Sequence, residues 1–322
     1  MLKYITKRLL LIIPVLIGIS LLSFLIIHLS PGDPLSLKYG LNPEISPQAK
    51  EYMNKLYGLD KPIIVQYVEW FKRILTLDFG TSFIDDRNVL EKIKERLPAT
   101  LILNILSLIL IFVIAIPVGV VSAVKHRTVF DKITTFFLYL GFSMPSFWFA
   151  LILIYIFGFK LNLFPISGIS PWYLEFLSPM EKFLTFLKHL FLPLITLSLL
   201  GLTGLAKYTK SSMLEILNQE YILMAKAKGL SAKRVIYIHA LKNALLPIIT
   251  IIGFAIPGLI SGSFIIETVF SWPGMGRLAY EAIMSYDYPT IMGIGIISTF
   301  LTLIGILISD ILYAIVDPRI RV

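Results

Sequence analysis

The residue types that carry out hydrolysis or metal chemistry are sparse in this chain. It has 322 residues and no cysteine, so disulfides, thiolate catalysis and Cys-ligated metals are excluded. The chain contains no Gly-Lys dipeptide, which a P-loop requires, no Gly-x-Ser-x-Gly, which marks a serine nucleophile elbow, and no His-Glu-x-x-His, which marks a zincin site. The four histidines are His28, His126, His189 and His239. No two of them are four residues apart, which argues against a metal site built on one helix. We therefore expect no enzyme, no resident metal and no cofactor bound by this chain.

Asp310 is the one acidic residue inside a long apolar segment. An ionisable side chain within a membrane is by default a functional-site hypothesis, because burying its charge is costly. Its position near the end of the segment favours a simpler role, namely pairing with Arg319, Arg321 or a cation of another chain.

The composition requires a membrane to surround the chain. It is 57% hydrophobic and 15% charged, with a mean hydropathy of +0.82, which is too apolar for a soluble domain of this size. A helix needs about 20 apolar residues to cross the hydrocarbon core, and six segments reach or approach that length. They are Leu9 to Leu29, Ala99 to Val124, Ile133 to Phe159, Leu190 to Ala206, Ala244 to Ile266 and Thr290 to Val316.

The charge distribution orients these spans. The loops on one side hold 15 Lys and Arg residues against four acids, whereas the opposite loops hold 14 basic against 15 acidic residues. The positive-inside rule therefore places both termini and the insert 207–243 in the cytoplasm of a cell (inner) membrane protein. Membrane topology thus explains the pI of about 9.5 without a nucleic-acid partner.

The insert between the fourth and fifth spans is predicted to be a docking element. Glu220 to Lys228 can form a helix that Gly229 closes in a left-handed conformation, and Ser231 can cap a second helix running from Ala232 towards Leu245. Small and basic residues suit close approach to an acidic groove of a soluble partner: Ala225, Ala227, Lys226, Lys228, Lys233, Arg234 and Lys242. An amphipathic helix lying on anionic membrane lipid fits the same residues, and both interpretations stay open.

On the opposite side, a large loop and a Gly-rich turn are the main features. We expect residues 30–98 to form a small extracytoplasmic cap with a helical stretch near Ile63 to Leu75. The turn that begins at Trp272 is predicted to be a rigid re-entrant or gating turn. Glu267 beside it is either a solvated interfacial carboxylate or a substrate contact, and polar span residues such as Ser146 and Ser261 either face a hydrated path or pack helices together.

The insert resembles the EAA loop of ABC importer permeases, with the Glu, Ala, Gly and downstream Leu-Pro in register. Tyr221 stands where that family usually has an acidic residue or Ala. Other stretches resemble the oligopeptide/dipeptide/nickel branch of the family, in matching order along nearly the whole chain. They are Pro31-Gly32-Asp33-Pro34, Leu77-Asp78-Phe79-Gly80-Thr81-Ser82, Arg96-Leu97-Pro98-Ala99-Thr100, Pro145-Ser146-Phe147-Trp148, Glu267-Thr268-Val269-Phe270 with Trp272-Pro273-Gly274-Met275-Gly276, and Asp317-Pro318-Arg319.

The resemblance implies an all-α, six-helix membrane protein with the type I ABC importer permease fold. It implies half of a translocation path for di- or oligopeptides, completed by a second homologous permease, two ATPase subunits carrying ATP and Mg, and an extracytoplasmic binding protein. The expected parts are 1–29, the cap 30–98, a five-helix core 99–316 containing the insert, and the tail 317–322. The implied coupling residues are Glu220, Tyr221, Ala225, Lys226, Ala227, Lys228, Gly229, Leu230 and Ser231. From residue type and position, the candidate outer-gate or substrate-path residues are Glu267, Trp272, Ser146 and Ser261.

Three alternatives accompany this prediction. The same machinery could import nickel complexes or another small solute. An ion-coupled secondary transporter would place ionisable residues near the bilayer midplane and show repeat symmetry, neither of which is visible. An intramembrane hydrolase would need a nucleophile, zinc or paired-carboxylate motif, and the chain has none of these.

Overall fold

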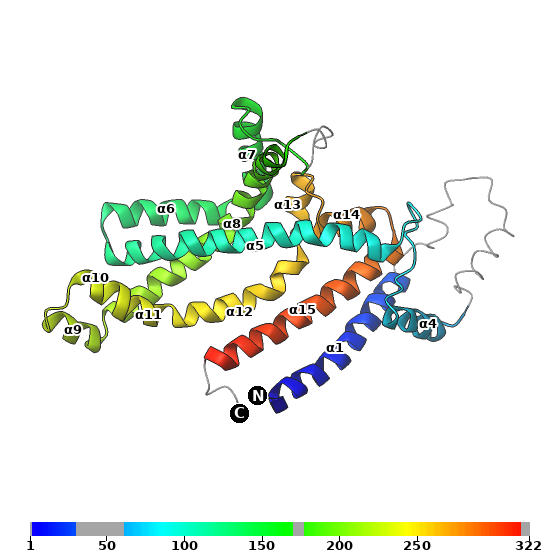
Figure 1. The fold of residues 1–322 in the computed structure, drawn as a ribbon, viewed down its shortest axis with the longest axis horizontal. Helices are drawn as coiled ribbons and strands as arrows, with labels where there is room; N and C mark the ends of the chain where they lie inside the picture. Colours follow the sequence, from blue (N-terminus) through cyan, green and yellow to red (C-terminus); the bar gives the residue numbers. More distant parts are fainter. Residues whose placement is uncertain (1, 30–60, 170–176, 317–322) are drawn as a thin grey trace. The chain divides into compact units, whose positions relative to one another are not determined.

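The structure is a computed structural model that describes residues 2–29, 61–169 and 177–316, and these residues are helical apart from turns and one isolated β-bridge between Thr81 and Asn88 (Figure 1). The all-α prediction is confirmed. The α-helices are α1 (Leu2–Leu29), α4 (Ile63–Leu75), α5 (Val89–Val124), α6 (Val129–Ser143), α7 (Ser146–Leu153), α8 (Pro179–Leu217), α9 (Glu220–Ala227), α10 (Ala232–Arg234), α11 (Leu241–Ala244), α12 (Leu246–Ser261), α13 (Phe264–Val269), α14 (Met275–Met284) and α15 (Tyr288–Val316). Two π-helical segments, Ile154–Lys160 and Val235–Ala240, continue α7 and α10.

Four helices in the described ranges are long and apolar enough to cross a membrane: α1, α5, α8 and α15. The pair formed by α6 and α7 with its π-helical continuation supplies a fifth if it is counted as one span, although it is bent by 106°. Pro145 explains the bend, because proline cannot donate the helical hydrogen bond at this position. The multi-pass character is thus confirmed, and the count of six stays a prediction.

Two of the predicted spans differ from expectation in their extent. The segment Leu190 to Ala206 is the shortest on hydropathy, yet it lies inside the 39-residue helix α8. This helix starts at a capping box, where the Ser178 hydroxyl accepts from the Glu181 N–H and the Glu181 carboxylate accepts from the Ser178 N–H. The segment 244–266 is instead divided at Gly262, between α12 and α13, where φ is +65°.

Contacts divide the chain into two compact units. One comprises residues 1–99 and 274–322, and the other comprises residues 100–273. The expected parts 1–29, 30–98, 99–316 and 317–322 stay a prediction. Residues 30–60 of the cap, with the Pro31 motif, and the tail 317–322 lie outside the described residues, whereas the helix expected at Ile63 to Leu75 is α4 with the same bounds.

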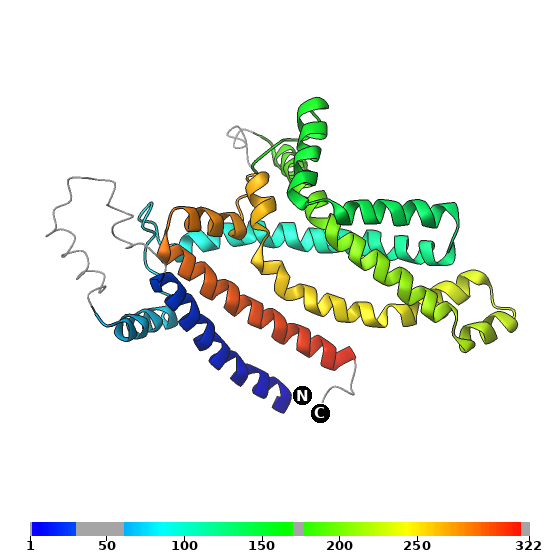
Figure 2. The ribbon, with the colours of Figure 1, turned by 180° about the vertical axis from the view of Figure 1, so that it is seen from behind.

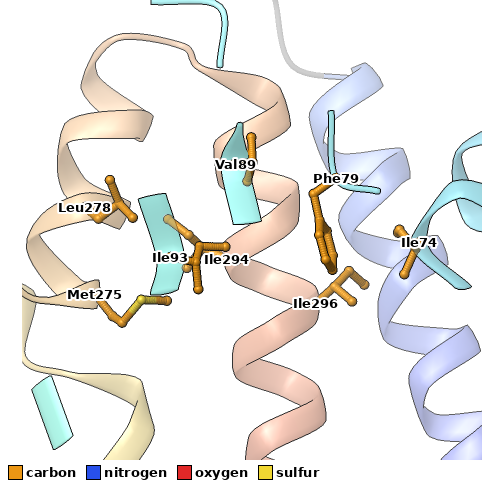
Figure 3. Packing of buried hydrophobic residues seen from close by; sticks show 8 residues of the cluster. All are labelled: Ile74, Phe79, Val89, Ile93, Met275, Leu278, Ile294 and Ile296. Atoms are coloured by element: carbon orange, nitrogen blue, oxygen red, sulfur yellow. The ribbon is translucent and has the colours of Figure 1, made fainter. Parts of the chain in front are cut away.

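The first unit is held together by an apolar cluster from both ends of the chain. Figure 3 shows Ile93 of α5 against Ile294 of α15, with Phe79 beside Ile296. Gly293 allows the close approach, because a Cβ there would lie 2.6 Å from Val89. The whole cluster is Ile74, Phe79, Val89, Ile93, Met275, Leu278, Ile294 and Ile296.

A buried carboxylate ties the loop before α5 to the start of α15. Asp287 is 1% exposed and accepts hydrogen bonds from the Ser82 hydroxyl at 2.5 Å, the Phe83 N–H at 2.9 Å and the Thr290 hydroxyl at 2.6 Å. Lys92 lies 3.7 Å from the same carboxylate. A buried charge needs such a full set of partners, so Asp287 fixes this end of the unit.

Asp310 also has a partner within this unit. Its Oδ2 lies 3.1 Å from Nη1 of Arg8, an ion-pair distance without the alignment of a hydrogen bond. Asp310 is thus paired with Arg8 of α1, a partner that was not among those predicted. Arg319 and Arg321, the partners predicted within the chain, lie outside the described residues. Sequence distance concealed this pair, because α1 and α15 pack together from opposite ends of the chain.

In the second unit, α8 packs against α5, α6, α7 and α11, and small residues set the spacing. A Cβ added at Gly119 of α5 would lie 2.6 Å from Cβ of Thr209, and one at Gly201 of α8 would lie 2.5 Å from Ile111. Close approach through small residues is the usual way in which membrane helices pack. Ser107 and Ser198 hydrogen-bond to each other at 2.9 Å across the same two helices.

Candidate functional site

Helices α9, α10 and α11 of the predicted coupling insert form a compact group at the C-terminal end of α8. Figures 1 and 2 show α9, α10 and α11 gathered near the turn between α5 and α6, away from α7. Ile222 and Ala225 of α9, with Val235 and Ala240 of the π-helical segment, are buried against Met213 of α8. The insert is therefore anchored to the membrane helices by its own apolar core.

The turn after α9 has the geometry that the glycine predicts. Gly229 has φ +74°, its N–H donates to the carbonyl of Lys226 at 3.0 Å, and the Leu230 N–H donates to the carbonyl of Ala225 at 3.3 Å. These two bonds form a Schellman motif, in which a left-handed residue ends the helix. The helix prediction is confirmed to within one residue of its predicted end at Lys228.

The second helix begins where it was predicted, without the predicted side-chain cap. Ser231 stands at the N-cap with extended backbone, but its hydroxyl accepts no capping hydrogen bond. The helix then passes through the π-helical segment and ends at Ala244, before Pro247. The predicted path of the chain is thus confirmed, and the serine contributes backbone geometry alone.

Two hydrogen bonds brace the insert. The Asn243 amide donates to the Tyr221 hydroxyl at 2.7 Å, which joins α11 to α9, and the Ser212 hydroxyl donates to the carbonyl of Ala244 at 3.1 Å, which joins α8 to α11. Tyr221, the departure from the usual family pattern, thus has a structural contact in this chain. Its partner Asn243 was not singled out as a site residue, because nothing in sequence spacing places positions 221 and 243 together.

The side chains that α9 and the following segment leave exposed are mostly basic or apolar, with Glu220 as the acidic exception. Of the predicted coupling residues, Glu220, Tyr221, Lys226, Ala227, Lys228, Gly229 and Ser231 are exposed, Leu230 is half-buried and Ala225 is 8% exposed. Ala225 therefore approaches the chain's own core, not an outside partner. Large apolar side chains that sequence reasoning missed are exposed beside them: Leu223 at 54%, Met224 at 61%, Tyr237 at 56% and Ile238 at 55%. Helical spacing could have indicated Leu223 and Met224, since they lie between the buried positions Ile222 and Ala225 and so point to the other side of the helix.

A charged cluster holds the turn between α5 and α6 to α8 near the insert. Lys210 of α8 lies 2.5 Å from the Asp131 carboxylate of α6, which also accepts from the Arg127 N–H at 3.0 Å. His126 lies 3.3 Å from the same carboxylate. The cluster thus fixes the turn between α5 and α6 to α8, the helix that leads into α9.

The residues predicted for an outer gate are more deeply placed than expected. The Glu267 side chain is 0% exposed and accepts a hydrogen bond from the Thr100 hydroxyl at 3.0 Å. Solvation and surface contact with substrate both presuppose an accessible carboxylate, and the folded chain instead encloses it. A role of Glu267 in a substrate path stays a prediction.

The Trp272 turn is a second Schellman motif. The Trp272 N–H donates to the carbonyl of Glu267 at 2.7 Å, and Ser271 takes φ +50° at the end of α13. Trp272 is 0% exposed, with its ring 6.2 Å from that of Phe186. Ser146 begins α7 half-buried, and the side chain of Ser261 lies outside the described residues. The four residues are thus not shown to converge on one site.

Comparison with known proteins identifies the family. The model for the binding-protein-dependent transport system inner membrane component matches residues 115–322, and the model for the N-terminal region of that membrane component matches residues 1–104. Both descriptions are of a transport component and not of a catalytic subunit.

Full-length relatives agree with this match. The chain is 44% identical over 322 residues to the oligopeptide transport system permease protein AppB of Bacillus subtilis (strain 168), with 100% of both chains covered. It is 38% identical over 338 residues to the dipeptide transport system permease protein DppB of Escherichia coli (strain K12), with 100% of this chain and 99% of the relative covered. Since the family models, the relatives and the membrane-spanning helices all agree, this all-helical chain belongs to the family of inner membrane components of binding-protein-dependent transport systems, and is a multi-pass membrane permease.

Proposed function

We propose that this chain forms half of the translocation path of an ATP-driven importer of di- and oligopeptides. The relatives named above are permeases of oligopeptide and dipeptide transport systems, and they match this chain from end to end. The cargo of such a system is selected largely by its binding protein, so the import of nickel complexes or another solute by the same machinery is the alternative.

The observation that carries the coupling role is the exposed surface of the insert. We define the coupling surface as the exposed side chains of α9 and of residues 228–238. It combines basic residues with unburied Leu223, Met224 and Tyr237, and exposed apolar groups framed by charge are typical of an interaction site. A separate cytoplasmic ATPase is the partner that we assign to it, with Glu220 and Gly229 fixing the ends of the docking helix.

The remaining partners follow from the proposed transport cycle. A second homologous permease completes the path, two ATPase subunits bind ATP and Mg, and an extracytoplasmic binding protein delivers the peptide. Lipid surrounds the spans, and both termini and the insert 207–243 face the cytoplasm, as the excess of Lys and Arg on that side indicates. Alternating access then requires a two-state movement of the permease helices.

ATP hydrolysis by the reconstituted complex tests the proposal. The complex, with its binding protein, is challenged separately with dipeptides, longer peptides and chelated nickel. We expect stimulation by one or both peptide classes and none by nickel. Stimulation by nickel alone would overturn the peptide assignment, and hydrolysis that is the same with and without this chain would overturn the coupling role.

A further inference from the structure

The helix α4 has three distinct faces along its 13 residues. At 100° per residue, Tyr67, Trp70 and Ile74 fall on one face and are buried or half-buried. Four charged or polar residues share a second face: Gln66, Glu69, Lys72 and Arg73. The third face is apolar and lies at positions i, i+4, i+7 and i+11: Ile64, Val68, Phe71 and Leu75.

Most of this apolar face is left uncovered by the described residues. Ile64 is 77% exposed, Val68 is 42% exposed and Leu75 is 70% exposed, and Phe71 is half-buried. Helices that project into water do not normally carry such a stripe, since a water-facing surface favours polar side chains. The stripe therefore needs an apolar environment.

Contacts with α1 place the helix at the depth of the membrane. The Tyr67 hydroxyl lies 2.9 Å from the Ser20 hydroxyl, and the Phe24 ring lies 5.5 Å from that of Tyr67 and 5.6 Å from that of Trp70. Ser20 and Phe24 belong to the membrane span Arg8–Leu25. In both ribbon views α4 lies beside the end of α1 that is far from the N-terminus (Figures 1 and 2).

The surface of α1 at this level is itself apolar and unburied. Leu21 and Leu22, in the same turns as Ser20 and Phe24, are 40% and 60% exposed. On a membrane-spanning helix such residues contact acyl chains. The apolar face of α4 thus adjoins a segment whose surroundings are lipid, which favours lipid over water as its neighbour.

We propose that α4 is an interfacial helix whose Ile64, Val68, Phe71 and Leu75 face lies in the lipid of the leaflet at the C-terminal end of α1. Lys72 and Arg73 are placed to meet lipid phosphates, and Tyr67 and Trp70 are of the residue types that accumulate at the membrane–water boundary. This part of the loop after α1 is therefore a membrane-bound strut and not part of a soluble cap. The inference holds whatever the cargo is.

Depth measurement with single cysteines tests the proposal, and the absence of cysteine from the chain supplies the background. Val68→Cys and Leu75→Cys report on the apolar face, and Glu69→Cys and Arg73→Cys are matched controls on the polar face of the same turns. Each full-length variant is expressed with cysteine-free partner subunits, spin-labelled and reconstituted in proteoliposomes. Power saturation then compares collision of the label with oxygen, which concentrates in lipid, and with a water-soluble nickel chelate.

The two faces should give opposite results. We expect labels at 68 and 75 to collide at least several-fold more often with oxygen than with the chelate, and labels at 69 and 73 to show the reverse. Access of the chelate to all four positions would place the face in water and overturn the proposal. Shielding of 68 and 75 from both reagents would show that protein covers the face, which would overturn it equally. Ile64→Cys replaces either apolar-face variant that does not assemble.

Discussion

At the scale of single residues, position 229 requires glycine because of its backbone conformation and not because of side-chain packing. Its φ of +74° is strained for residues with a Cβ, yet a Cβ added there would meet nothing within 4 Å. Conformation alone therefore selects glycine at this position.

We predict that Gly229→Ala and Gly229→Pro weaken the coupling surface, whereas Gly229→Asn largely preserves it. Asparagine tolerates the left-handed region, alanine is disfavoured there by about 1 to 2 kcal/mol, and proline cannot adopt a positive φ. Copurification of the ATPase subunit and peptide uptake measure the effect. Equal retention of the ATPase by all three variants would show that the turn does not set the docking geometry.

Asp85 provides a titratable residue outside the membrane spans. Burial raises the pKa of its carboxyl, but hydrogen bonds to neighbouring groups, Lys92 among them, outweigh burial and leave the pKa below its ordinary value of 3.8. Because the folded state binds this proton less tightly than the unfolded state, the carboxylate stabilises the fold above pH 3.8 and loses this effect as the pH falls through the folded pKa.

We therefore predict that Asp85→Asn lowers the melting temperature at neutral pH, and that the difference from the parent chain begins to shrink near pH 3.8 and vanishes once the pH is below the folded pKa of Asp85. Thermal melts of the purified chain at stepped pH measure this. In a Lys92→Met background the neutral-pH difference should shrink, because the cation that lowers the pKa is gone. A difference that persists unchanged into acid would mean that Asp85 acts by shape and not by charge.

At the scale of elements, charge and apolar exposure together define the coupling surface. Lys226 and Lys228 are exposed at the end of α9, beside exposed Leu223 and Met224. Charged side chains at the rim of an interface mainly affect association rates and salt dependence, whereas apolar anchors affect dissociation.

Two double variants should separate these contributions. Lys226→Glu with Lys228→Glu should slow ATPase association and reduce its salt dependence, and Leu223→Ser with Met224→Ser should speed dissociation. Lys182→Glu with Lys188→Glu, exposed on the opposite end of α8, is the matched charge control and should bind normally. Surface plasmon resonance on immobilised chain measures both rates, and unchanged rates in the two test variants would remove the docking assignment.

The crossing of α5 and α8 depends on the lack of a side chain at Gly119. A Cβ there would lie 2.6 Å from Cβ of Thr209 and 2.7 Å from the carbonyl oxygen of Ala206. We predict that Gly119→Ala destabilises the second unit by about 1 to 3 kcal/mol through overpacking. Gly204→Ala on α8, where a Cβ would meet nothing within 4 Å, should be neutral or slightly stabilising. Denaturant titration in mixed micelles compares them, and equal stability of the two variants would contradict this account of the crossing.

Sequence pattern was most informative where local chemistry decides the structure. The bounds of α4, the left-handed Gly229 and the end of the insert before Pro247 all follow from local periodicity, glycine and proline. The pairing of Asp310 with Arg8, the enclosure of Glu267 and the bond between Tyr221 and Asn243 depend instead on which distant helices meet. A single sequence does not show which distant helices pack together. It therefore identified Asp310 as an unusual carboxylate but did not identify Arg8 as its partner.

At the scale of the whole molecule, orientation can be tested with the same cysteine-free background. The charge distribution predicts that Lys228 of the insert faces the cytoplasm and that Asp78, in the loop after α4, faces the opposite side. A membrane-impermeant maleimide added to intact cells should label Asp78→Cys and spare Lys228→Cys until the cytoplasmic side is opened. The reverse pattern would invert the topology and exclude the insert from contact with a cytoplasmic ATPase.

The first unit consists of residues 1–99 and 274–322, so its two parts are synthesised at different times. During synthesis, α1 leaves the ribosome first, but α15, which carries the partner of Arg8, leaves last. At about 5 to 20 residues per second, residues 100–273 impose a delay of roughly 10 to 35 s. Throughout that interval α1 can contact α4 but not α15, while residues 100–273 can already fold. A stop codon just after residue 273 would therefore remove α14 and α15, and with them the residues that Ile93 and Arg8 contact in the first unit.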